Sequence, residues 1–267
     1  MDETGWCAPI DLYCERAGVG FWAEPINAVS NGAFLLAAAL AFASWRAAGG
    51  RDGFTLFLIG VVAATGIGSF LFHTYANRWS LLADVIPITI FIYAFFLLAM
   101  RRFLRLGWIA AALLTLAFFG ASAVFPAGWT ALFGEEADAN GSVSYFPAAL
   151  ALICVGGLLV LKARRAETVL MNRKNQAWGG EDESARARAF LDKVAAPHEA
   201  GTALLLAAAT FAASLVFRSI DVAVCGWLPI GTHFLWHVLN AVVLFVLVRA
   251  AIRGRAGGGA PTAPARS

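Results

Sequence analysis

Residues 53–73 read GFTLFLIGVVAATGIGSFLFH, a run that contains no Asp, Glu, Lys or Arg. A helix crosses the bilayer core with about 20 apolar residues, so this run is long enough to span a membrane. It is too long for a strand of a membrane barrel, which needs about 9–11 residues. Further runs of the same kind lie on both sides of it. The predicted spans lie near residues 27–47, 53–74, 81–100, 104–123, 143–162, 199–218 and 230–250.

The composition of the whole chain is that of an integral membrane protein. Of its 267 residues 60% are hydrophobic and 14% are charged, and the mean hydropathy is +0.72. Soluble domains contain roughly 45–50% apolar residues. We therefore predict an all-α membrane protein, a seven-transmembrane helix bundle that forms one domain over residues 1–253. Residues 254–267 are rich in Gly, Ala and Pro and are expected to form a disordered tail.

The charged residues predict the side on which each connection lies. Basic residues collect in alternate connections, most densely in 163–198, whereas the segment 1–26 and the connection 124–142 are mainly acidic. The positive-inside rule then places the N-terminus outside and the C-terminus in the cytoplasm. We expect 163–198 to be a cytoplasmic loop with a short helix near 184–195. The Ala- and Arg-rich composition indicates a bacterial inner membrane, with a eukaryotic endomembrane as the alternative. A charge pattern set by topology gives no reason to expect a nucleic-acid partner.

Ionisable side chains inside the spans are few, and such residues usually mark functional sites because they are costly in a bilayer. His233 and His237 are four residues apart, so a helix presents both on one face, about 6 Å apart. The predicted topology brings His73 to the same depth in the membrane. Three imidazoles leave the fourth position of a tetrahedral zinc ion open for water, which is typical of a catalytic zinc site. The remaining histidine, His198, lies at the opposite end of its span and is expected to be a loop residue.

Two more polar residues are predicted to lie near these histidines. Ser69 lies one helical turn before His73, and Asp84 begins the return span about one turn below the same surface. Each has a structural alternative: Ser69 can donate back to a carbonyl of its own helix, and Asp84 can orient a ligand histidine. As catalytic residues, Asp84 would transfer a proton and Ser69 would stabilise the oxyanion of the reaction.

Three of the four cysteines, Cys7, Cys14 and Cys225, are predicted on the outer side, where disulfides persist. A bridge between Cys14 and Cys225 would fix the acidic N-terminal segment over the mouth of the site. Cys7 is the alternative partner, and spacing alone does not choose between the two. Cys154 lies within the span 143–162 and is expected to be a small packing residue.

Three patches of the sequence resemble the alkaline ceramidase family, which belongs to a wider group of seven-helix membrane hydrolases that includes the adiponectin receptors. The resemblance extends over all seven predicted spans, although the specific matches are confined to these patches. The patches are Gly66-x-Gly68-Ser69-x-x-x-His73 followed by Asp84 and Pro87; His233-x-x-x-His237; and Asp11-Leu12-Tyr13-Cys14-Glu15 followed by Glu24-Pro25-x-Asn27-x-x-Ser30-Asn31.

The resemblance implies a zinc ion held by His73, His233 and His237, with Ser69 and Asp84 in the same site. It further implies a zinc-dependent amide hydrolase that cleaves ceramide-like membrane lipids to a sphingoid base and a free fatty acid. The partners implied are this lipid substrate and the bilayer itself.

The resemblance also implies calcium bound by an acidic cluster in the N-terminal segment. The matching acidic positions are Asp11, Glu15 and Glu24. This chain departs from the family pattern in two places, because Leu12 stands where the family has Trp, and Arg16 or Ala17 stands where it has Asn. The alternative is an acidic outer segment that follows from topology alone.

Two other functions are alternatives at this point. One is a hydrolase that acts on a different lipid amide or ester, since an apolar sequence does not encode the head group. The other is a non-enzymatic seven-helix lipid sensor with a structural zinc ion. A channel or transporter fits less well, because its polar residues would be spread through the membrane and here they gather near one face.

Overall fold

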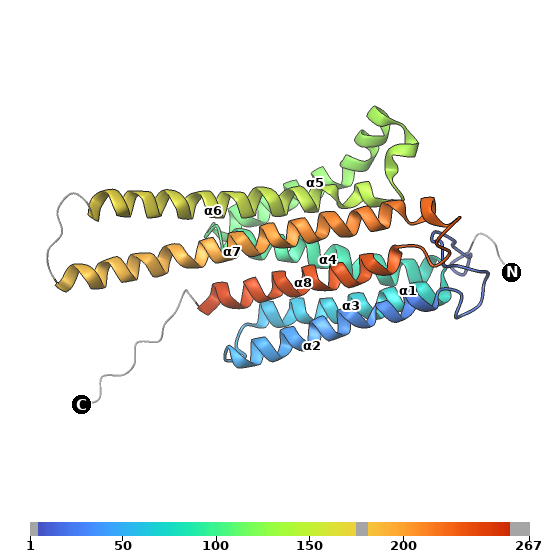
Figure 1. The fold of residues 1–267 in the computed structure, drawn as a ribbon, viewed down its shortest axis with the longest axis horizontal. Coiled ribbons are helices and arrows are strands. Elements are labelled where there is room, and N and C mark those ends of the chain that lie inside the picture. The colour runs from blue at the N-terminus through green and yellow to red at the C-terminus, as the bar shows by residue number, and fades with distance from the viewer. Residues whose placement is uncertain (1–4, 175–180, 257–267) are drawn as a thin grey trace.

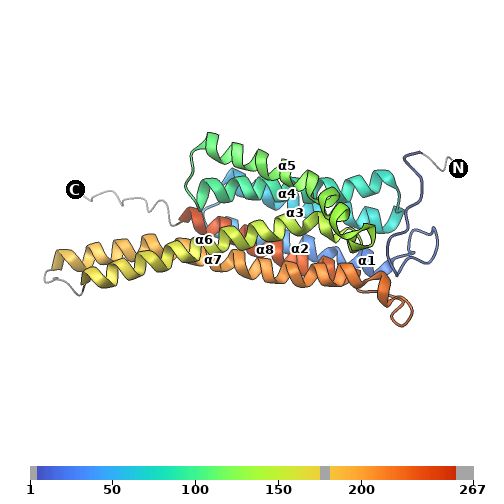
Figure 2. The same cartoon turned by 90° about the horizontal axis from the view of Figure 1, so that it is seen from above.

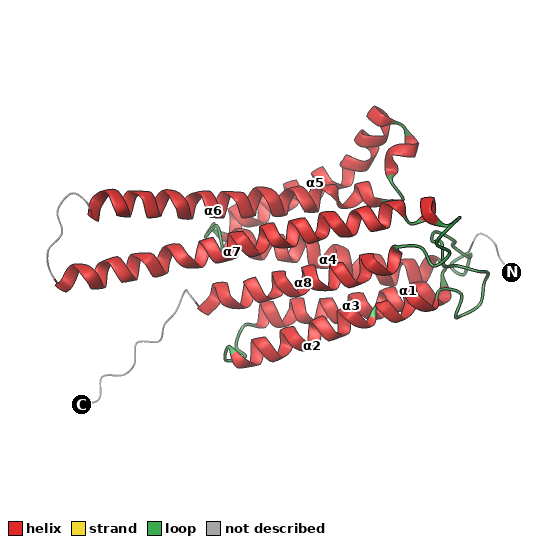
Figure 3. Ribbon diagram, in the orientation of Figure 1, coloured by secondary structure: helices red, strands yellow, loops and turns green. Residues whose placement is uncertain are grey.

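The computed structural model describes residues 5–174 and 181–256, with only the backbone described for 170–174, 181–196 and 256. Helices make up most of this part of the chain, and loops are found mainly at the helix ends (Figure 3). The long helices lie side by side as a bundle (Figure 1). The helices are α1 (Pro25–Ser30), α2 (Gly32–Ala47), α3 (Gly53–Tyr75), α4 (Arg78–Arg102), α5 (Trp108–Phe133), α6 (Phe146–Lys174), α7 (Glu181–Ile220) and α8 (His233–Ala256), with the short 3-10 helices η1 (Glu135–Asp138), η2 (Ser142–Tyr145) and η3 (Val222–Val224).

Seven helical segments are long and apolar enough to cross a membrane, and the chain is an integral multi-pass membrane protein. α1 and α2 together form the first segment, Pro25–Ala47, and only the second half of α7, Pro197–Ile220, belongs to the sixth. The described residues contain no β-strand beyond one isolated bridge between Pro9 and Asn77. The predicted all-α, seven-helix fold is therefore confirmed.

The bounds predicted for two connections between spans, 124–142 and 163–198, are wrong, because helix extends into both. The sequence predicts a fourth span at 104–123, whereas α5 runs from Trp108 to Phe133, because its apolar residues continue through Pro126 and the acidic residues begin only at Glu135. Most of the predicted loop 163–198 is helical, and the predicted helix 184–195 is part of α7. This stretch is rich in Ala, Arg and Glu, which favour helix. The extended ends of α6 and α7 protrude together at the left of Figure 1.

The bundle has two ends, which we name by their contents. The site end carries the segment before α1, the α3–α4 turn and the start of α8; the far end carries the α2–α3 turn and the end of α8 (Figure 1). His198 lies about 33 Å along α7 from Ile220, at a rise of about 1.5 Å per residue, and is therefore remote from the site end. α8 ends at Ala256, and the rest of the predicted tail, from residue 257, lies outside the described residues.

The core of the bundle lies around α3 and α8. Half of the residues in the apolar segments of these two helices are buried. By contrast, α5 buries only Ala111 and lies at the edge of the bundle (Figure 2). α3 carries Ser69 and His73, and α8 carries His233 and His237, so these four polar residues lie inside the bundle, whereas Asp84 lies on the neighbouring helix α4.

Candidate metal centre and active site

The segment before α1 crosses the site end of the bundle and is fastened there by a disulfide. Cys14 is bonded to Cys225, and their Cα atoms are 5.3 Å apart. This pairing is one of the two that the sequence left open, and Cys7 and Cys154 are free. The Asp221 carboxylate adds a second connection, because it accepts a hydrogen bond from the backbone N–H of Cys14 at 3.0 Å.

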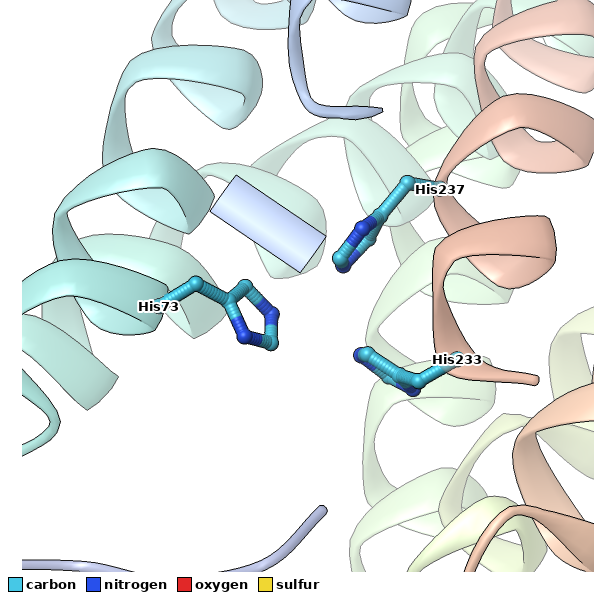
Figure 4. A group of neighbouring side chains, drawn as sticks. All are labelled: His73, His233 and His237. Carbon is cyan, nitrogen blue, oxygen red and sulfur yellow. The ribbon is translucent and has the colours of Figure 1, made fainter. Parts of the chain in front are cut away.

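Three buried histidines point toward one another between α3 and α8 (Figure 4). His73 lies in the last turn of α3, while His233 and His237 lie in the first two turns of α8. Their ring centroids are 4.6–5.2 Å apart. One nitrogen of each ring lies within 4.8 Å of the corresponding nitrogens of the other two. Within the described part of the chain, no other group of three His, Cys, Asp or Glu residues is close enough to share a metal ion.

The side chains behind two of these rings determine which nitrogen faces the centre. His73 Nδ1 donates to Glu24 Oε2 at 2.5 Å, and the Ser30 hydroxyl donates to the Asn27 carbonyl at 2.8 Å. Since Ser30 has used its only hydrogen, its oxygen accepts from His237 Nδ1 at 2.7 Å. A ring protonated at Nδ1 carries its lone pair on Nε2. Both rings are therefore held in the form that a metal ligand requires.

The third ring is held by stacking and by the backbone. His233 lies 3.6 Å from the Tyr13 ring, centroid to centroid, at an interplanar angle of 20°. The Asp221 carboxylate accepts from the backbone N–H groups of Thr232 at 2.6 Å and His233 at 2.9 Å, which caps the start of α8. Burial raises the pKa of the Tyr13 hydroxyl and outweighs the nearby Arg218 charge, so Tyr13 stays protonated at neutral pH.

This set of donors fits a zinc ion. Imidazole nitrogens are among the preferred ligands of zinc, and three of them leave one coordination position open. His73 Nε2 and His233 Nδ1 are buried and have no hydrogen-bond partner among the described residues. Leaving a buried polar atom unpaired costs free energy, and a bound cation would remove that cost at His73 Nε2.

Close packing of α3 against its neighbours places Ser69 beside Asp84. A side chain at Gly68 would overlap with the Ala83 carbonyl of α4, so only glycine allows this approach. Pro87 has no N–H and therefore leaves that same carbonyl without its helical donor. The result is that the Ser69 hydroxyl lies within hydrogen-bonding reach of the Asp84 carboxyl group. Asp84 Oδ1 is buried and unpartnered in the described structure.

The structure gives separate surroundings to the three acidic residues matched to the calcium cluster. Glu15 accepts from the backbone N–H groups of Ile26 at 2.6 Å and Asn27 at 2.7 Å, and thereby caps α1. Asp11 is exposed. Among the described residues, Asp11, Glu15 and Glu24 do not form a group close enough to share an ion.

Glu24 instead belongs to the histidine site. Its Oε2 contacts His73, as described above, and its Oε1 accepts from Arg16 Nε at 2.5 Å. Burial would raise the pKa of Glu24, but the hydrogen bond and charge of His73 and the charge of Arg16 hold that pKa below its ordinary value. Glu24 is therefore ionised at neutral pH and can keep His73 Nδ1 protonated.

Two charged residues near the site, one buried and one half-buried, were not predicted from the sequence. One is Asp221, which connects Cys14 to the start of α8. The other is Arg218 of α7, whose guanidinium donates to the Tyr13 hydroxyl at 2.8 Å and lies 5.2–5.7 Å from the ring centroids of Tyr13, Tyr145 and Trp236. Both charges stand at the end of an apolar span, the same signal that drew attention to Asp84.

An apolar pocket of about 80 Å³ begins one helical turn below the site. Thr65, Ile88 and Asn240 line it, each one turn closer to the far end than Ser69, Asp84 and His237, respectively. Trp236 and Leu247 of α8 also line the pocket. At about 1.5 Å per residue these two are about 16 Å apart along the helix axis. Further lining residues include Phe34, Phe91, Phe95, Tyr145 and Phe211.

Comparison with family models matches residues 10–256 to the Ceramidase family. The matched region includes all seven membrane-spanning segments and all of the site residues described above. Comparisons with curated proteins and with solved structures return no match.

Proposed function

The chain belongs to the Ceramidase family, and we propose that it is a zinc-dependent hydrolase that cleaves the amide bond of ceramide-like N-acyl lipids within the membrane. The products are a sphingoid base and a free fatty acid. The observation that carries the proposal is the convergence of three buried imidazoles beside Ser69 and Asp84, at the head of an apolar pocket.

In this proposal His73, His233 and His237 hold the zinc ion. Glu24 and Ser30 fix the orientation of two of the rings through Nδ1, which leaves Nε2 to bind the metal. When bound, zinc polarises the amide carbonyl and makes water a stronger acid. We assign no step of the reaction to calcium.

We assign the proton transfers to Asp84. Its Oδ1 is buried without a partner in the described structure, so this oxygen can accept a proton from the attacking water. The water oxygen attacks the amide carbon, the C–N bond breaks, and the proton on Asp84 passes to the leaving amine nitrogen. Once Asp84 carries this proton, the Ser69 hydroxyl no longer donates to a carboxylate and can donate to the carbonyl oxygen, which gains negative charge.

The apolar pocket gives this site access to a lipid. Its lining is almost entirely aliphatic and aromatic, which suits an acyl chain, and it starts directly below Ser69, Asp84 and His237. A lipid whose chain enters this pocket would present its amide group at the depth of the three histidines. The substrate therefore reaches the site without leaving the bilayer.

The topology belongs to the same proposal. The distribution of Lys and Arg supports an N-terminus outside and a C-terminus in the cytoplasm, which puts the site end toward the extracytoplasmic face. We propose a bacterial inner membrane as the location. We also propose that residues 1–253 form one domain and that residues 254–267 follow it as a tail.

The proposal is tested by product analysis on the purified full-length protein in detergent. Zinc-loaded protein should release fatty acid from N-acyl sphingoid bases, and metal-depleted protein should not. The Asp84→Asn variant, prepared in parallel, excludes a contaminating hydrolase. Fatty acid release from lipid esters, but from no N-acyl sphingoid base, would contradict the proposed substrate class. Tight lipid binding without any cleavage would favour a non-enzymatic lipid sensor.

A further inference from the structure

Arg16 places a positive charge inside the N-terminal segment, directly behind the histidine site. Its side chain is only 5% exposed. Nε donates to Glu24 Oε1 at 2.5 Å, one terminal nitrogen donates to the Gly18 carbonyl at 3.2 Å, and the other donates to the His73 carbonyl at 3.4 Å. The guanidinium is thus surrounded by one carboxylate and two carbonyl oxygens.

These are the kinds of oxygen that a calcium ion binds. Calcium takes six to eight oxygen ligands from carboxylates, carbonyls and water. Here the carboxylates that such a site would need are engaged elsewhere: both oxygens of Glu15 cap α1, and both oxygens of Glu24 accept from Arg16, His73 and Asn27. Asp11 is exposed, and among the described residues it does not form a group with Glu15 and Glu24 that could hold an ion. The residues present therefore do not fit the calcium ion that the family resemblance implies.

We propose that the Arg16 guanidinium is a built-in cation that takes the place of this calcium ion, so that the chain fastens its N-terminal segment to α3 without calcium. Arginine suits the position because its planar group donates in several directions and remains charged at any physiological pH. The His73 carbonyl lies in the last turn of α3, where carbonyl groups lack helical donors and carry the negative end of the helix dipole. The Arg16 guanidinium therefore donates a hydrogen bond to the His73 carbonyl and at the same time balances the negative charge of Glu24.

Arg16 is in this account a positioning residue for the metal site. It holds Glu24 Oε1, Glu24 Oε2 holds His73 Nδ1, and His73 Nε2 is left to face the other two rings. Partners of this kind behind a ligand histidine typically change metal affinity about 10–100-fold when they are removed. This part of the inference rests on the proposed zinc site, whereas the independence from calcium does not.

The first experiment uses the unaltered protein. Full-length, zinc-loaded protein in detergent is transferred to buffer freed of calcium with a chelating resin, and its Tm is measured with and without millimolar calcium. Calcium binding is measured in parallel by titration calorimetry. We expect an unchanged Tm and no binding heat. A ligand that binds only the folded state must raise the Tm, so a calcium-dependent increase, or one equivalent of bound calcium, would overturn the proposal.

The second experiment compares Arg16→Ala, Arg16→Lys and the exposed-site control Arg46→Ala. Arg16→Ala should lower the Tm and weaken zinc affinity about 10–100-fold. Arg16→Lys should have a Tm and a zinc affinity between those of Arg16→Ala and the unaltered protein, because lysine keeps the charge but not the planar set of donors. Arg46→Ala should resemble the unaltered protein. Equal Tm and zinc affinity in Arg16→Ala and the unaltered protein would overturn the proposal.

These two experiments remain decisive if one variant fails or if the proposed function is wrong. Should Arg16→Ala not fold, the calcium titration and Arg16→Lys still test the proposal. A chain that bound no zinc would refute the proposed function, yet the effects of Arg16 and calcium on the Tm would still be measurable.

Discussion

The two ends of the bundle each carry a buried or half-buried polar cluster, and the clusters differ in how their hydrogen bonds are completed. At the far end Asp52 caps α3 by accepting from the N–H of Thr55 at 3.2 Å and its hydroxyl at 2.6 Å. Arg102 forms an ion pair with Asp52 at 2.8 Å and donates to the Ala251 carbonyl at 2.6 Å. This cluster joins three helix ends.

At the site end, by contrast, hydrogen bonding is incomplete. His73 Nε2, His233 Nδ1 and Asp84 Oδ1 are buried without partners among the described residues. Such atoms are costly in an apolar setting. The difference supports the proposal that the site-end cluster binds a ligand and takes part in a reaction, whereas the far-end cluster stabilises the fold. This comparison can be tested by changing matched residues at the two ends.

The largest effect is expected from His237→Ala. The variant loses one of the three proposed zinc ligands, so bound zinc should fall from one ion per chain to almost none, and turnover should fall below detection. Metal analysis of the purified variant measures the first effect. His198→Ala, which changes the one histidine far from the site, should retain both zinc and turnover. Full zinc content in His237→Ala would contradict the assigned ligands.

The next effect is expected from Asp84→Asn. The amide cannot accept the proton from water, so kcat should fall by about 10²–10⁴-fold, the usual contribution of general acid–base catalysis. Zinc content should not change. Asp52→Asn makes the same chemical change at the far end and should leave kcat near that of the unaltered protein. A kcat for Asp84→Asn within a factor of a few of the original would assign Asp84 a structural role.

Ser69→Ala should also lower kcat, but by less than Asp84→Asn. Loss of one oxyanion donor typically lowers kcat by about 10²–10³-fold, and the zinc content should remain complete. Ser44 donates to the Leu40 carbonyl of its own helix, so Ser44→Ala serves as the control for a hydroxyl that only bonds back to its helix. If the two variants had the same kcat, Ser69 would be a packing residue.

The smallest effect is expected from Asp52→Ala, which should alter stability and not chemistry. Loss of a helix cap costs about 0.5–2 kcal/mol, while zinc content should not change. Burial would raise the pKa of Asp52, but hydrogen bonds from Thr55 and the Arg102 charge hold it below 3.8. The carboxylate therefore stabilises the fold above pH 3.8, and this contribution is lost as the pH falls through the lower, folded-state pKa.

That pH dependence separates the Asp52 effect from a general loss of packing. The difference in unfolding free energy between the unaltered protein and Asp52→Ala should be constant near neutral pH and should narrow in strong acid. Thermal unfolding in detergent over a pH series measures it. A difference that widened in acid would contradict the ion-pair account.

Most of the fold was predictable because span length and hydrophobicity are local properties of the sequence. The three histidines were predictable for the same reason: spacing puts His233 and His237 on one helix face, and alternation of the spans brings His73 to the same end. The end of α5 was not predicted correctly, because the helix continues past the predicted end at residue 123, through Pro126, to Phe133. The helical extensions of α6 and α7 were likewise hidden by a polar composition that is typical of loops.

The residues around the site were harder to predict because their roles depend on contacts between distant segments. Nothing local shows that Asp221 bonds to the backbone of Cys14, or that Ser30 orients His237. Arg16 could be noticed only as a departure from the family pattern, and its position beside Glu24 required the folded N-terminal segment. Arg218 could have been selected from the sequence, because a charged residue at the end of an apolar span is the same signal that selected Asp84.

The central claim is that three imidazoles, one from α3 and two from α8, bind one zinc ion. X-ray absorption at the zinc edge of the purified, unaltered protein tests it most directly. The account predicts one zinc per chain with three imidazole nitrogens and one further light-atom ligand, at distances of about 2.0–2.1 Å for nitrogen. Sulfur in the coordination sphere, or fewer than three imidazole ligands, would contradict it.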